Sequence, residues 1–124
     1  MSRGALRCGA AFGLLTSPHR SRTDLRTISD RFDLTSRLAL VTGASRGIGQ
    51  ALAVGLAEAG ADIVATARSE SGLTKTADAI AEKGRRCHPI ACDLTAAGAV
   101  TTLFKTLADR SLSPTILINN AGME

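Results

Sequence analysis

Short apolar runs alternate with longer amphipathic segments from Arg37 to the end of the chain. The apolar runs predict four buried strands, at residues 38–41, 62–67, 87–92 and 115–119. The segments between them have the length and spacing of helices. Strands that alternate with helices in this way are typical of repeated βαβ units, so we expect an α/β protein with a parallel sheet.

Each of the three intervening segments carries apolar residues at helical spacing. We expect Ser71 to cap the second helix and glycines to end the first two, at Gly60 and Gly84. The positions that mark the three helices are, in order, Ile48, Leu52, Leu56 and Ala59; Leu73, Ala77, Ile80 and Ala81; and Val100, Leu103, Phe104 and Leu107.

The handedness of the crossovers predicts the order of the strands. Because connections between parallel strands are right-handed, the first two helices should cover one face of the sheet, and the third crossover should reverse direction. That reversal opens a crevice between the first and fourth strands at their carboxyl ends, where open α/β sheets bind ligands. The predicted fold is a Rossmann-type doubly wound parallel sheet, represented by its first four strands and three helices.

The stretch VTGASRGIG, residues 41–49, contains three glycines between the first strand and the first helix. A tight turn alone would need one glycine, or two. Gly43, Gly47 and Gly49 together would clear room for a pyrophosphate to approach the backbone at the positive end of a helix. We therefore predict an anion-binding turn there.

The net charge of +4 does not indicate nucleic-acid binding. Four arginines and no acid precede residue 24, and the rest of the chain is neutral. The three phenylalanines offer little base stacking. No apolar run approaches the roughly 18 residues of a membrane span. We therefore expect a soluble, cytoplasmic domain with neither nucleic acid nor membrane as a partner.

Residues 1–33 differ in composition from the rest. They are rich in Arg and Ser and contain no acid before Asp24, which is typical of a mitochondrial transit peptide. On a helix, however, Arg3, Arg7 and Leu14 would share one side, so the polar and apolar faces would not separate. A disordered leader and a targeting segment both stay open.

Three cysteines, Cys8, Cys87 and Cys92, lie at no metal-ligand spacing, so we expect reduced thiols and no metal site. Cys87 and Cys92 differ by an odd number of positions. On a strand they would therefore point to opposite faces.

Two motifs at this separation, TGASRGIG at 42–49 and NNAG at 119–122, resemble those of the classical short-chain dehydrogenase/reductase family. The likeness extends over residues 34–124 and includes the pair Asp93 and Leu94 after the third strand. It implies the amino-terminal part of an NAD(P)-binding domain in an oxidoreductase that interconverts alcohols and ketones. It also implies a small-molecule substrate and a complete enzyme that is a homo-oligomer.

The resemblance also implies the cofactor contacts. Asp93 would meet the adenine, and residues of NNAG would lie along the adenosine ribose, while Asn120 would tie neighbouring strands together. Sheet stabilisation by NNAG is an equal alternative to cofactor contact. The implied cofactor-binding residues are Gly43, Ser45, Arg46, Gly47, Ile48, Gly49, Arg68, Asp93, Leu94, Asn119, Ala121 and Gly122.

Cofactor choice in this architecture depends on the residues just past the second strand. The resemblance places Ala67 where NAD-dependent members of the family have an acid, and Arg68 where NADP-preferring members have a base. Arg46 adds a second cation. Because a guanidinium binds a 2′-phosphate with charge-assisted hydrogen bonds, we expect NADP rather than NAD.

The family's catalytic serine, tyrosine and lysine have no counterparts here, and the chain contains no tyrosine. We therefore predict no catalytic residue in this chain and no redox activity from it alone. Two interpretations stay open: a fragment of a short-chain oxidoreductase, or a nucleotide-binding or regulatory module. The lead-in FDLTSRLALVTG, 32–43, resembles that of gluconate 5-dehydrogenases, and 3-oxoacyl carrier-protein reductases also carry TGASRGIG. Sugar-acid chemistry ranks narrowly first.

Overall fold

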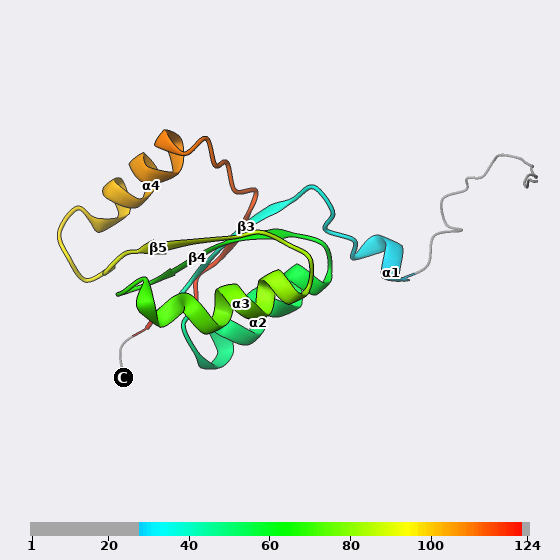
Figure 1. The fold of residues 1–124 in the computed structure, drawn as a ribbon. Helices are drawn as coiled ribbons and strands as arrows, with labels where there is room; N and C mark the ends of the chain where they lie inside the picture. The colour runs from blue at the N-terminus through cyan, green and yellow to red at the C-terminus, as the bar shows by residue number, and fades with distance from the viewer. Residues whose placement is uncertain (1–27, 123–124) are drawn as a thin grey trace, which may run out of the picture. The chain divides into compact units, whose positions relative to one another are not determined.

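The computed structural model describes residues 28–122. The chain divides into two units, Met1–Asp33 and Leu34–Glu124. In the first unit the structure describes the short helix α1, Ile28–Arg31, and the second unit contains the sheet with its helices (Figure 1). The predicted leader, residues 1–33, and Cys8 lie largely outside the described residues, so that interpretation stays a prediction.

The sheet has four parallel strands in the order β5-β4-β3-β6. The first strand by sequence, β3, therefore lies between β4 and β6, and the predicted reversal of direction is confirmed. Leu40 of β3 pairs with Val64 of β4 on one side and with Leu117 of β6 on the other. The strands are β3, Leu38–Thr42; β4, Asp62–Ala67; β5, Cys87–Ala91; and β6, Ile116–Ile118.

Helices cover both faces of this sheet. Buried residues of α2 and α3 pack with one face, and buried residues of α4 pack with the other, as the handedness argument predicts (Figure 1). Gly60 and Gly84 follow α2 and α3 with φ of 110° and 76°, so both predicted stop positions are confirmed. The helices are α2, Gly47–Glu58; α3, Thr74–Glu82, after a 3-10 turn η2, Ser71–Leu73; and α4, Ala99–Asp109.

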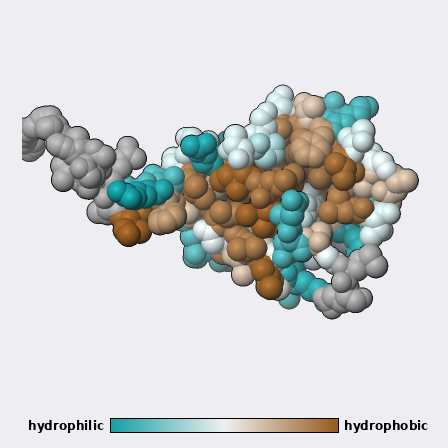
Figure 2. Space-filling model, turned by 180° about the vertical axis from the view of Figure 1, so that it is seen from behind, coloured by the Kyte–Doolittle hydropathy of each residue, from teal (hydrophilic) through white to brown (hydrophobic). Residues whose placement is uncertain are grey.

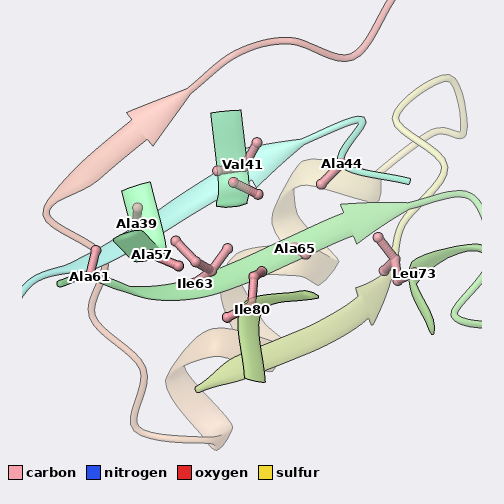
Figure 3. Packing of buried hydrophobic residues seen from close by; sticks show 10 residues of the cluster. Ala39, Val41, Ala44, Ala57, Ala61, Ile63, Ala65, Leu73 and Ile80 are labelled. Carbon is pink, nitrogen blue, oxygen red and sulfur yellow. The ribbon is translucent and has the colours of Figure 1, made fainter. Parts of the chain in front are cut away.

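The face covered by α2 and α3 is built largely from small side chains (Figure 3). Ala39 and Ala65 of the sheet belong to one buried cluster with Ala53 and Ala57 of α2. The predicted stripe of α2 is therefore wrong in detail, because Ile48 is 73% exposed and Leu52 is also exposed. Alanines allow the helix to approach the sheet more closely than leucines would.

The opposite face uses larger side chains. Leu103 and Leu107 of α4 pack against Leu40, Val64 and Ile90, and all five are buried. Two other marker positions of this helix, Val100 and Phe104, are exposed by more than half, so the predicted helix is correct but its apolar stripe is narrower.

Two further predictions about α3 are wrong. Ser71 does not cap the helix; instead Ser69 Oγ accepts a hydrogen bond from the Gly72 N–H at 3.3 Å, at the start of η2. Ala81 is exposed, and the buried residues of this helix are Thr76 and Ile80. The extra 3-10 turn shifts where the helix begins.

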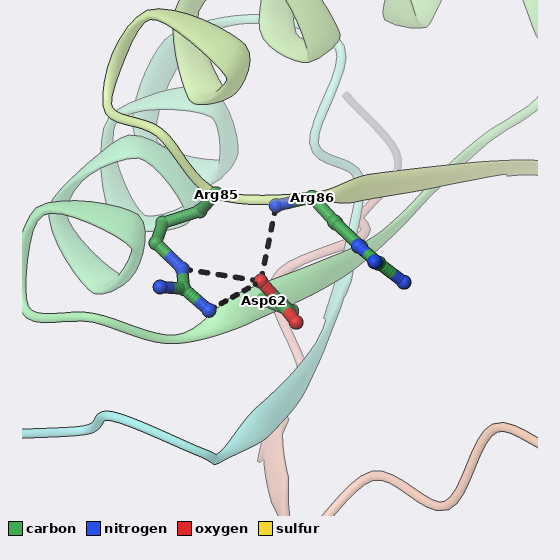
Figure 4. Close-up of polar contacts among 3 residues, drawn as sticks. All are labelled: Asp62, Arg85 and Arg86. Atoms are coloured by element: carbon green, nitrogen blue, oxygen red, sulfur yellow. Dashed lines mark hydrogen bonds and ion pairs between the residues drawn. The ribbon is translucent and has the colours of Figure 1, made fainter.

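Charge fixes the amino-terminal ends of β4 and β5 (Figure 4). Asp62 Oδ1 accepts hydrogen bonds from Arg85 Nε at 3.1 Å, Arg85 Nη2 at 3.0 Å and the Arg86 N–H at 3.0 Å. Burial raises the pKa of Asp62, but these bonds and the two arginine charges outweigh it, so the pKa is lowered.

Several large apolar side chains stay exposed on the described part of the second unit. Figure 2 shows a broad apolar area on the side of the molecule opposite to that seen in Figure 1. None of the described helices combines the length and apolar character that crossing a bilayer requires. The exposed large apolar side chains of this unit are Ile48, Leu52, Leu94, Val100, Phe104 and Leu117.

Candidate cofactor-binding site

The predicted anion site lies where β3 ends and α2 begins. Gly43 and Gly47 have φ of 64° and 60°, so the chain turns sharply twice within this segment. Arg46 stands at the N-cap in an extended conformation, without a side-chain cap hydrogen bond. The first bond of the helix runs from the Gln50 N–H to the Arg46 carbonyl at 3.3 Å. The N–H groups of the three preceding helical residues therefore have no partner within the helix, which suits an anion.

The three glycines of the turn have different roles. A Cβ at Gly49 would collide with the Gly43 carbonyl and the Asn120 side chain, and one at Gly43 would lie 2.9 Å from Ala121 Cα. These two glycines therefore let the turn pack closely on itself and on residues 120–121. Gly47 has open space where a side chain would stand. That the three glycines together clear room for a pyrophosphate stays a prediction, and Gly47 is the one of the three beside open space.

Residues after β6 are tied to the end of β3 through Thr42. Its hydroxyl accepts hydrogen bonds from the Asn120 and Ala121 N–H groups, both at 3.0 Å, and donates to the Ile118 carbonyl at 3.4 Å. The Asn120 amide donates to the carbonyls of Thr42 at 3.3 Å and Gly43 at 3.1 Å. The predicted role of Asn120 in tying neighbouring strands is confirmed, and Asn119, Ala121 and Gly122 are exposed beside it.

Ala44 is held from two sides inside the turn. Its N–H donates to the carbonyl of Thr66 at the end of β4 at 3.0 Å, and its carbonyl accepts from Thr76 Oγ1 at 2.7 Å. Thr76 is fully buried. Helical periodicity does not single out Thr76, because it marks apolar positions. The available signal was a hydroxyl on the inward side of α3, between Leu73 and Ile80.

Arg68 and Asp93 lie at the same carboxyl edge, one after β4 and the other after β5, and both are exposed. The hydroxyl and N–H of Thr95 donate to Asp93 Oδ1 at 2.6 and 3.0 Å. These bonds, with a smaller effect of the Arg68 charge, lower the pKa of Asp93. The lowered pKa favours the charged form of the carboxylate at this edge.

A hollow of about 250 Å³ adjoins Asp93, between the end of β5 and the first turns of α4. Cys92, Thr102 and Thr106 line it. Among residues 28–122, no three His, Cys, Asp or Glu side chains gather as a metal ion would need. What the site offers is backbone N–H groups, exposed arginines and one carboxylate.

The comparison with known families agrees with this arrangement. The sequence model of the short chain dehydrogenase family matches residues 37–124. The chain belongs to the short-chain dehydrogenase family. This family comprises NAD(P)-dependent oxidoreductases, and the matched residues include the whole turn, Arg68, Asp93 and the NNAG segment.

Similar members of the family come from bacteria. The rhamnolipids biosynthesis 3-oxoacyl-(acyl-carrier-protein) reductase of Pseudomonas aeruginosa is 43% identical over 91 residues, which are 73% of this chain and 35% of that protein. The gluconate 5-dehydrogenase of Gluconobacter oxydans is 40% identical over 96 residues, 77% of this chain and 37% of that protein. The chain thus spans about a third of the length of these short-chain dehydrogenases.

A solved structure gives the same fold. The 3-oxoacyl (acyl-carrier-protein) reductase of Agrobacterium tumefaciens with NADP bound is 36% identical, with a TM-score of 0.75 over 83% of this chain and 39% of that chain. The sheet order and the helix arrangement described above are therefore those of a Rossmann-type short-chain dehydrogenase.

Proposed function

We propose that this chain is the cofactor-binding part of an NADP-dependent short-chain oxidoreductase that interconverts an alcohol and a ketone. A sugar acid or a 3-oxoacyl compound would be the substrate. The observation that carries the proposal is the start of α2, where free N–H groups, the open space at Gly47 and the Arg46 N-cap face the same turn.

The described residues fit a dinucleotide. The pyrophosphate would lie on the amino end of α2, where a negative charge is favoured by the unpaired N–H groups. Asp93 would accept from the adenine amino group, and Asn119, Ala121 and Gly122 would lie along the ribose. When bound, the nicotinamide supplies or accepts the hydride.

The preference for NADP rests on charge beyond β4. Ala67 ends the strand without an acid, and Arg68 is exposed after it. A guanidinium attracts the 2′-phosphate, and a carboxylate at that position would repel it. The Agrobacterium relative carries NADP, which supports the same choice here.

Titration of the full chain with NADPH and NADH tests this preference. We expect tighter binding of NADPH, and in Arg68→Ala we expect its affinity to fall about 10-fold, since a charge-assisted pair is lost. NADH affinity should stay unchanged. Arg110→Ala, which removes an exposed arginine after α4, is the matched control. Equal binding of the two cofactors by the unaltered chain would refute the preference.

We further propose that the chain alone carries out no redox reaction, because it contains no tyrosine to exchange a proton with the substrate oxygen. NADPH oxidation should stay at the background rate with a 3-oxoacyl thioester and with a keto sugar acid. Turnover above that rate would contradict this.

A nucleotide-binding or regulatory module is the second candidate, because the described residues offer cofactor contacts and no catalytic group. The reading frame after the Glu124 codon separates the two. A Tyr-x-x-x-Lys motif downstream would support the oxidoreductase, and a stop codon with no such motif nearby would support the module.

A further inference from the structure

Thr76 is the buried polar residue of α3. Its hydroxyl donates to the turn between β3 and α2 rather than to its own helix. Leu73 and Ile80, on the same side of the helix, are both fully buried apolar residues. A valine would fit this position as well by shape, so the hydroxyl calls for an explanation other than packing.

The bond joins two segments that are 32 residues apart. Thr76 Oγ1 donates to the Ala44 carbonyl at 2.7 Å, within a buried environment. Ala44 is itself fully buried, so water does not compete readily for its carbonyl. The amino end of α3 also lies beside the turn, because a Cβ at Gly72 would stand 3.6 Å from Ser45 Cβ.

The Ala44 carbonyl and the Ser45 N–H belong to one planar trans peptide unit, in which they point in opposite directions. Holding the carbonyl toward α3 therefore aims the Ser45 N–H away from α3. If this peptide turned over, a carbonyl oxygen would replace an N–H there, and it would repel an anion. The preceding carbonyl, of Gly43, is held separately by the Asn120 amide at 3.1 Å.

We propose that Thr76 is a positioning residue for cofactor binding: its hydroxyl fixes the Ala44–Ser45 peptide, so that the turn is set for a phosphate before the cofactor arrives. The inference rests on the proposed function of the turn as a dinucleotide site. Preorganisation of this kind increases affinity, because the turn loses less freedom when the ligand binds.

Three variants of the full chain test the role of the hydroxyl. Thr76→Val keeps the shape and removes the hydroxyl, Thr76→Ser keeps the hydroxyl, and Ile80→Val trims the same buried side of α3 without touching the turn. NADPH affinity is measured by fluorescence titration. In parallel, amide hydrogen exchange of Ala44 is followed by NMR without cofactor, since its N–H bond to Thr66 reports on the turn.

We expect Thr76→Val to weaken NADPH binding about 10-fold, the equivalent of one buried hydrogen bond, and to speed exchange at Ala44. Thr76→Ser and Ile80→Val should bind like the unaltered chain. Unchanged affinity in Thr76→Val, or an equal loss in Ile80→Val, would overturn the positioning role and leave the proposed function intact.

Failure of the proposed function looks different. If the unaltered chain bound no NADPH, the cofactor assignment would fail, and exchange at Ala44 would decide the role of Thr76. Faster exchange at Ala44 in Thr76→Val alone would support the role of the Thr76 hydroxyl in fixing the turn. The same exchange in all variants would overturn it.

Discussion

The two faces of the sheet are built on different principles. Beneath α2, alanines such as Ala39, Ala53 and Ala57 bring helix and sheet close together. Beneath α4, the contacts are made by Leu40, Leu103 and other large side chains. The packing under α2 depends on small side chains, and the packing under α4 depends on large ones.

The candidate site belongs to the closely packed face. Ala44 is part of the same cluster as Ala53 and Ala57, and Gly49 of α2 lies against the Gly43 carbonyl. Close packing leaves few alternative positions for the turn, and a phosphate site needs fixed N–H groups. Among the described residues, no part of the candidate cofactor-binding turn lies in the cluster under α4. Side chains there should therefore be able to repack, but shortening them should lower stability.

The largest effect is expected on the α4 face. Leu107→Ala removes a buried leucine and should lower the free energy of unfolding by about 2–4 kcal/mol. Urea unfolding followed by circular dichroism measures this loss. Phe104→Ala, on the exposed side of the same helix, should change stability by less than about 0.5 kcal/mol. Equal losses would mean that the two sides of α4 are buried alike.

The opposite change should affect the other face. Ala57→Leu inserts bulk between α2 and the sheet and should cost about 1–3 kcal/mol, because the close approach leaves no room for it. Ala51→Leu, at an exposed position of α2, is the matched control and should be nearly neutral. If Ala57→Leu stabilised the chain in urea unfolding, the face would contain unfilled space, and the comparison would fail.

A smaller effect is expected where charge, rather than packing, holds the strands. The pKa of Asp62 is lowered in the folded chain, so its contribution is present above the unfolded pKa of about 4 and is lost as pH falls through the folded value. Asp62→Asn should cost about 1 kcal/mol at pH 7. The difference from the unaltered chain should shrink toward pH 3. A difference independent of pH would exclude the carboxylate charge as the cause.

The smallest expected effect is a difference in labelling rate between the two described cysteines, which lie on opposite faces of the sheet. Cys87 packs with the α2 and α3 cluster, and Cys92 packs with the α4 cluster, which confirms their predicted placement. Burial raises the pKa of Cys87 to about 11, and burial together with the Asp93 charge raises that of Cys92. In a Cys8→Ser background at pH 8, iodoacetamide should label Cys87 more slowly, because only the thiolate reacts. Faster labelling of Cys87 would contradict the raised pKa of its thiol.

The sequence by itself determined the order of elements, the parallel sheet and the place of the glycine turn between β3 and α2. Alternating apolar runs and helical segments, with the rule for right-handed crossovers, are enough to place β6 beside β3. The TGASRGIG and NNAG motifs then identified the family. Such motifs can be read from sequence because a backbone with positive φ or a close approach requires glycine at fixed positions.

Only the tertiary structure decided which side of each helix is buried and which residues hold the glycine turn in place. Periodicity marks apolar positions, but it carries no information on the distance between helix and sheet, so Ile48 and Phe104 could not be distinguished from core residues. Periodicity also predicted that Ala81 is buried in α3, whereas the structure buries Thr76 instead, and the reason is the same. A hydrogen bond between residues 32 positions apart, as between Thr76 and Ala44, depends on how two segments meet in space, and no local pattern encodes that meeting.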